Sequence, residues 1–71
     1  MELIISQNSK KIDSISGKTE KAILKKLSDS KHWDDITVEA LDFLDVEEEE
    51  LTVQDVLKLS GEGDYEFKLK K

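Results

Sequence analysis

Ser16-Gly17-Lys18-Thr19 is the first stretch whose residue types could do chemistry, because Gly-Lys-Thr at the start of a helix can bind phosphate. The complete motif needs a further glycine five residues before Gly17, and that position is Ile12. A chain of 71 residues is also too short for the parallel sheet that carries such loops. The stretch therefore predicts the start of a helix and no nucleotide or other cofactor.

Four consecutive glutamates, Glu47 to Glu50, could attract a hard cation. A calcium loop places acids at alternating positions around a central glycine and ends in a bidentate glutamate, and this spacing is missing. The sequence has one histidine, His32, and no cysteine, which excludes thiolate catalysis and the usual zinc sites. We expect no pocket that could separate the pKa values of two carboxyl groups in so small a chain. The sequence thus predicts neither a metal site nor catalytic residues, and a protein that is not an enzyme.

The charges are divided along the chain. Residues 1–31 carry seven lysines and four acids, residues 32–66 carry thirteen acids and one lysine, and residues 67–71 carry three lysines. The local charge is therefore +3, then −12, then +3, within a net charge of −6. So dense an acidic centre can attract a basic protein surface, including one built for nucleic acid. Opposite ends of two copies could also attract each other.

The predicted partner-binding surface follows from this division. Trp33 stands where the basic and acidic parts meet, and its two candidate roles are core packing and an exposed contact in an interface. We expect His32 at the surface or at a helix end. The residues predicted to bind a partner are Trp33, Asp34, Asp35, Glu39, Asp42, Asp45, Glu47, Glu48, Glu49 and Glu50.

The N-terminal half predicts a hairpin and a helix. Residues 3–5 and 12–15 are β-permissive and flank the turn-forming stretch 7–10. Residues 19–29 form a helix in which Thr19 is the N-cap and Ile23, Leu24 and Leu27 make one apolar stripe.

The acidic centre also predicts helical structure. Asp34 or Asp35 caps a second helix with an inward face of Ile36, Ala40, Phe43 and Leu44. A short strand at 36–38 is the alternative, since Ile36, Thr37 and Val38 are β-branched.

The C-terminal part predicts a third helix or a second hairpin, followed by a strand. Thr52 and Asp55 approximate a capping box, Val53, Val56 and Leu57 face inwards, and Gly61 ends the helix. The alternative pairs 56–60 with 65–69 as a hairpin. In the last strand Tyr65, Phe67 and Leu69 alternate with charged residues, which suits a sheet edge.

These elements predict an α+β fold: a small single domain over residues 1–71, with two or three short helices on a short, mainly antiparallel sheet that includes 64–70. A core of this size supplies about 3–5 kcal/mol. We therefore weigh a homodimer, which would bury more apolar surface. No stretch reads as a signal peptide or approaches the ~20 apolar residues of a membrane span, so we expect a cytoplasmic protein. All eleven basic residues are lysine, a composition that suits an AT-rich bacterial or phage genome.

A strand at 11–16 followed by helices at 19–29 and 34–45, with Glu39-Ala40-Leu41 and Leu44 in the second helix, is similar to the ribbon-helix-helix repressors. The resemblance covers about half the chain and implies a DNA-binding dimer. The ribbon Lys11 to Ser16 has a single lysine, arginine is absent, and Asp34-Asp35 opens the second helix, so nucleic acid is the weaker prediction. We favour a small protein-interaction module, such as an inhibitor or regulator. A structural subunit of a larger assembly is a further alternative.

Overall fold

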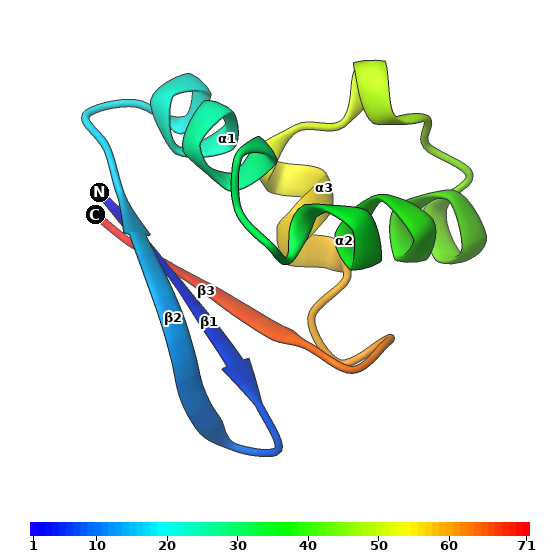
Figure 1. Ribbon diagram of the computed structural model, residues 1–71, viewed down its shortest axis with the longest axis horizontal. Coiled ribbons are helices and arrows are strands. Elements are labelled where there is room, and N and C mark those ends of the chain that lie inside the picture. Colours follow the sequence, from blue (N-terminus) through cyan, green and yellow to red (C-terminus); the bar gives the residue numbers. More distant parts are fainter.

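The computed structural model describes residues 1–71 and has eight secondary-structure elements around one core (Figure 1). In chain order they are β1 (Glu2–Gln7), β2 (Lys10–Ser16), α1 (Glu20–Ser28), α2 (Trp33–Glu39), the π-helix η1 (Ala40–Leu44), the 3₁₀ helix η2 (Glu48–Glu50), α3 (Val53–Lys58) and β3 (Glu66–Lys70). The helices cover one face of the sheet, and the two termini lie beside each other. The predicted α+β fold is confirmed, with three α-helices. None of its helices combines the length and apolar composition needed to cross a membrane.

The sheet is antiparallel throughout and has the strand order β2-β1-β3. The predicted N-terminal hairpin is confirmed, and its two-residue turn, Asn8 and Ser9, has φ values of 55° and 65°. Two successive positive φ values are typical of the turn type that matches the twist of a hairpin. The pairing shifts after Ile5, which leaves Ile12 as an extra, exposed residue in a bulge.

Alternating residues of the strands face the helices. Leu3 pairs with Ile15 on one side and Leu69 on the other, and Ile5 stands opposite Phe67. Leu3 and Ile5 are fully buried, as expected for the central strand. The alternation predicted for the C-terminal strand is confirmed, and β3 does lie at an edge.

Helix α1 forms as its sequence predicts. The Thr19 hydroxyl accepts a hydrogen bond from the Ala22 backbone N–H, which satisfies one of the free donors at the helix start. Ile23 and Leu27 are fully buried, and Leu24 packs against the edge of the core.

Helix α2 begins earlier than predicted. His32, not Asp34 or Asp35, is the N-cap, and it makes no side-chain cap. Both aspartates lie in the first turn, where a negative charge still favours the positive end of the helix. The alternative of a strand at 36–38 is wrong, because Ile36 is buried at one position of a helical face.

The π-helix η1 corrects the predicted inward face. Ile36 and Ala40 are buried and Leu44 packs against the core, but Phe43 is 49% exposed. A π-turn bonds i to i+5, so each residue advances by less than the ~100° of an α-helix. Three such steps from Ala40 leave Phe43 further from the core. Backbone N–H groups of Asp45 and Val46 both donate to the Ala40 carbonyl, and Asp45 ends the element with φ of 55°.

Helix α3 settles the choice left open for residues 51–60. The Thr52 hydroxyl accepts from the Asp55 N–H and the Asp55 carboxylate accepts from the Thr52 N–H, so the capping box is confirmed and the alternative hairpin is wrong. Val53 and Val56 are buried and Leu57 is half-buried. The helix ends at Lys58 with Leu59 as C-cap, two residues before Gly61.

Candidate protein-interaction surface

An open groove runs along the outer side of α2 and η1, opposite η2. Thr37, Val38 and Leu41 line it from the helix, and Glu47, Glu48 and Glu49 line it from η2 and the residue before it. Its volume is about 300 Å³. The site thus combines an apolar floor with an acidic rim; we call it the acid-rimmed groove.

The floor consists of apolar side chains that the core does not need. Val38 and Leu41 are 64% and 55% exposed, and they lie three residues apart, so they sit one above the other on the helix surface. The core instead takes Ile36 and Ala40 from the opposite side of the same helix. Burial of the inner side therefore fixes the direction in which Val38 and Leu41 face solvent.

Trp33 holds the rim in place. Its indole Nε1 donates to Glu48 Oε2 at 3.1 Å, while its ring packs against the core. Leu51, directly after η2, is buried and fixes the other end of the short helix. Trp33 thus has both a core contact and a contact with a predicted binding residue.

The predicted acidic residues divide into two groups. Eight are exposed and lie on α2, η1, η2 or the chain between them: Asp34, Asp35, Asp42, Asp45, Glu47, Glu48, Glu49 and Glu50. Three of these line the acid-rimmed groove, and Glu50 lines a neighbouring hollow between α1 and η2. Glu39 belongs to the second group because it is turned away from the groove.

Glu39 supports the loop between α3 and β3. Its Oε2 accepts a hydrogen bond from the Asp64 backbone N–H at 3.5 Å, and its Oε1 is buried without a partner. Gly63 approaches so closely that a Cβ there would overlap the Glu39 carboxyl group. Burial raises the pKa of Glu39, helped by the nearby charges of Asp64 and Asp35, although the Asp64 N–H acts in the opposite direction. Its role is in the fold.

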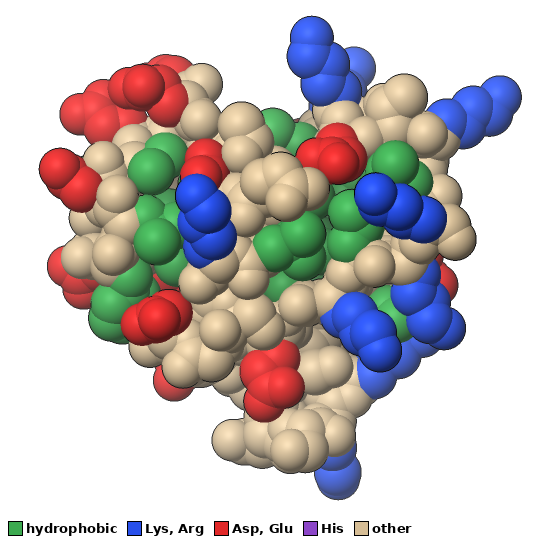
Figure 2. All heavy atoms as spheres, turned by 180° about the vertical axis from the view of Figure 1, so that it is seen from behind, with side chains coloured by type: hydrophobic (Ala, Val, Ile, Leu, Met, Phe, Trp, Pro, Cys, Tyr) green, Lys and Arg blue, Asp and Glu red, His purple; other side chains and the backbone are tan.

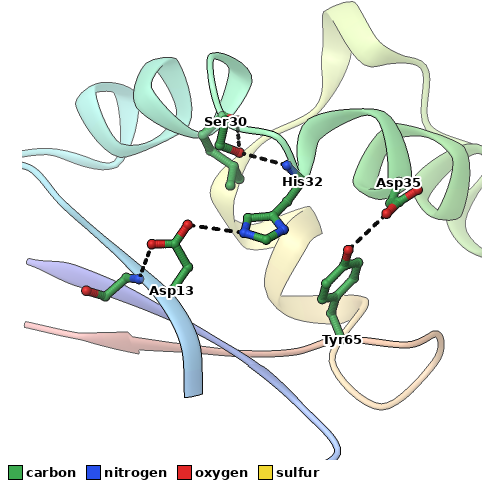
Figure 3. A network of polar contacts seen from close by, with 7 residues as sticks. Asp13, Ser30, His32, Asp35 and Tyr65 are labelled. Atoms are coloured by element: carbon green, nitrogen blue, oxygen red, sulfur yellow. Dashed lines mark hydrogen bonds and ion pairs between the residues drawn. The ribbon is translucent and has the colours of Figure 1, made fainter. Parts of the chain in front are cut away.

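A line of polar contacts ties α2 to the sheet beneath it (Figure 3). Asp13 on β2 lies with its Oδ2 3.1 Å from His32 Nε2, and the His32 ring packs edge-on against Tyr65. The Tyr65 hydroxyl then donates to Asp35 Oδ2 at 2.9 Å. The expectation that His32 lies at a helix end is confirmed, but it is not a surface residue, since it is only 6% exposed. The contacts fix the position of the helix that carries the groove.

Tyr65 is the group in this line with the most altered acidity. Burial, the hydrogen bond to Asp35 and the charges of Asp35, Glu39 and Asp64 raise the pKa of Tyr65 to about 12. Each cause disfavours a phenolate near carboxylates and away from water. The hydroxyl therefore remains a hydrogen-bond donor at neutral pH.

The acidic face is not neutralised by the protein's own lysines. The one ion pair of the structure joins His32 and Asp13, so none of the eleven lysines lies within salt-bridge distance of a carboxylate. Figure 2 shows the separation on one face: acidic side chains gather at the left around exposed apolar atoms, and most lysines lie at the right. The separation along the sequence is thus a separation in space.

No group of three or more His, Asp or Glu side chains converges as metal ligands would. Comparison with protein-family models, with curated proteins and with solved structures finds no match to this chain. The contribution that sequence reasoning missed is the groove floor. Val38 and Leu41, spaced i and i+3 off the predicted inward face of an acidic helix, were the available signal.

Proposed function

We propose that this chain is a small, cytoplasmic, non-enzymatic protein-interaction module, acting as an inhibitor or regulator that binds a basic surface of another protein. The observation that carries the proposal is the set of eight exposed carboxylates without a lysine partner around an exposed apolar groove. Unpaired surface charge costs little in water, and its field extends over about one Debye length, roughly 8–10 Å. It therefore acts on a partner before contact.

The groove supports specific binding beyond attraction between charges. Surface ion pairs contribute little each, with typical values of about 0–1 kcal/mol. Exposed apolar area contributes about 25 cal/mol per Å² when a partner covers it. Val38 and Leu41 offer such area inside the acidic rim. Charge would thus give the rate and the choice of partner, and the apolar floor would add affinity.

DNA binding has less support as an alternative. The order of a strand and two helices agrees with the ribbon-helix-helix resemblance, but β2 pairs with β1 of the same chain. Asp34 and Asp35 are both exposed in the first turn of α2, where a phosphate would have to approach. Self-association and a structural role in an assembly remain alternatives that the test below separates.

The test compares two triple variants immobilised at equal density and exposed to lysate of the native host. The first, Asp42→Asn with Glu47→Gln and Glu49→Gln, neutralises the groove side. The second, Asp29→Asn with Glu62→Gln and Glu66→Gln, removes equal charge elsewhere from exposed positions. We expect a basic protein to bind the wild type and the second variant, to bind the first at least about tenfold less tightly, and to dissociate as salt rises.

Two results would count against this proposal. Equal retention by both triple variants would mean that the groove side is not the binding surface. Retention that does not change between about 50 and 500 mM salt would mean that charge does not drive the association.

A further inference from the structure

The acid-rimmed groove limits the shape of what can occupy it. Its length is set by Val38 and Leu41, which are one helical turn apart, or about 4.5 Å along the axis. Its volume of about 300 Å³ is at the lower end of small-molecule sites, which also present buried donors that orient a ligand. Here the polar lining groups are one threonine and three glutamates. The groove suits a few aliphatic side chains whose neighbours are cations.

An extended peptide does not fit this site. A bound strand needs an open sheet edge to satisfy its backbone groups. At the β2 edge, the Ser14 N–H is already bonded to Asp13 Oδ1, at 2.8 Å. At the β3 edge, the Phe67 N–H donates to Ser60 Oγ and the Tyr65 carbonyl accepts from the Gly61 N–H. The groove itself is lined by helical segments, whose backbone groups bond within their own helices.

A helix satisfies its own backbone and presents side chains at the required spacing. Residues i and i+4, or i and i+3, of a helix lie on one face, so two aliphatic side chains can enter alongside Val38 and Leu41. Lysines or arginines on both flanks of that stripe would then approach Glu47 and Glu49 on one side and Asp42 on the other. The bound helix would therefore be amphipathic and basic.

We propose that the acid-rimmed groove binds a basic amphipathic α-helix of the partner protein, with two aliphatic side chains one turn apart against Val38 and Leu41. This inference rests on the proposed function and names the occupant of its surface. It adds a requirement that charge alone does not impose, since the aliphatic pair must contribute to binding.

The probes are two synthetic peptides of about 16 residues, a length at which an alanine-rich sequence can form a helix in water. Both carry the same lysines on the flanks of one face. The first has two leucines four residues apart on that face, and the second has serines in their place. Isothermal titration at about 50 mM salt measures the affinity of each peptide for the full-length chain. We expect the leucine peptide to bind at least about tenfold more tightly than the serine peptide.

Two protein variants locate the contact. Leu41→Ser removes part of the groove floor, whereas Ile12→Ser removes an exposed apolar side chain from the hairpin bulge. Both positions are exposed, so both variants should fold, which circular dichroism checks. We expect Leu41→Ser to weaken the leucine peptide about tenfold, to leave the serine peptide unchanged, and Ile12→Ser to change neither affinity.

Equal affinity for the two peptides, or an equal effect of the two serine variants, would overturn the inference while leaving the proposed function in place. Absence of peptide binding with retention of a basic host protein would have the same meaning. Sedimentation that shows a dimer dissociated by Leu41→Ser would also overturn it, because a second copy would then fill the groove. Failure of the proposed function is separate and appears as equal host-protein retention by the two charge variants.

Discussion

Tyr65 shows how single residues of this fold link elements that are distant in sequence. Its ring packs against His32 and Phe67, and its hydroxyl donates to Asp35. The surroundings that hold it also raise its pKa to about 12. Because the folded value lies above the unfolded value of 10.0, the folded state favours the protonated phenol. The resulting stability is present below pH 10 and is lost as pH rises from 10 to about 12.

This predicts an alkaline titration that one substitution shifts. The chain has a single tyrosine, so ultraviolet phenolate absorbance reports Tyr65 alone. We expect a midpoint near pH 12 in the wild type and a lower midpoint, closer to 10, in Asp35→Asn, which removes the main charge. Asp34→Asn, at the exposed neighbouring position, is the matched control and should leave the midpoint unchanged. A wild-type midpoint at pH 10 would contradict the assignment.

Such residue contacts were beyond the reach of the sequence pattern. His32 is a polar residue beside a tryptophan, and nothing in its neighbours reveals that Asp13, nineteen positions earlier, lies against its ring. The closeness of Gly63 to Glu39 likewise arises from a loop that folds back on α2. Contacts of this kind depend on tertiary packing, which local propensity does not encode.

At the scale of elements, α3 depends most on its ends. It has six residues, fewer than an isolated helix needs, so its capping box and its buried side chains must offset the cost of nucleation. Thr52 supplies both halves of the N-terminal arrangement, because its hydroxyl accepts from Asp55 N–H and its N–H donates to the Asp55 carboxylate.

Thr52→Ala should therefore destabilise the fold by about 1 kcal/mol, within the range of roughly 0.5–2 kcal/mol for a lost N-cap. Urea unfolding followed by circular dichroism measures the change as a lower midpoint with an unchanged slope. Gln54→Ala, at an exposed position in the same helix, should cost less than about 0.5 kcal/mol. Equal costs for the two variants would show that the cap does not stabilise α3.

The sequence predicted those elements whose signals are local. The capping residues Thr19 and Thr52, the alternation of Tyr65, Phe67 and Leu69, and the polar turn at 7–10 each reflect a short-range preference. The π-turn in η1 does not, because an α-helical spacing fits Ala40, Phe43 and Leu44 equally well. The actual turn depends on the chain leaving the core after Leu44, where Asp45 takes a left-handed conformation.

At the scale of the whole molecule, one small core holds all layers together. Its thirteen buried side chains come from both β-hairpin strands, the three α-helices, η1, β3 and the chain between them. A core of this size supplies about 3–5 kcal/mol, so the loss of one large buried side chain, which costs about 2–5 kcal/mol, is comparable with the whole stability.

Ile23→Ala is accordingly expected to leave the chain largely unfolded at room temperature. Ile23 is fully buried, and its truncation opens a cavity between α1 and the sheet. Ile12→Ala, at a position 42% exposed, removes the same atoms from the surface and should cost less than about 1 kcal/mol. Thermal unfolding by circular dichroism distinguishes them. A shared melting temperature would mean that α1 does not complete the core.

The candidate site was half predictable at this scale. The dense acids were visible in the sequence, and eight of them do lie exposed around one face. The apolar floor was not, because Val38 and Leu41 become recognisable as surplus only when Ile36 and Ala40 are known to fill the core side of the helix. The distribution of apolar residues between core and surface requires the helix orientation that Asp13, His32 and Tyr65 fix.

The spatial separation of lysines and carboxylates also gives the molecule an electric dipole moment. In the field of a charged partner, a dipole experiences a torque as well as a force. Random collisions between proteins mostly fail because the two patches face the wrong way, which lowers association rates well below the diffusion limit. This chain would rotate during its approach so that the acid-rimmed groove leads, and a larger fraction of its encounters would begin in a productive orientation.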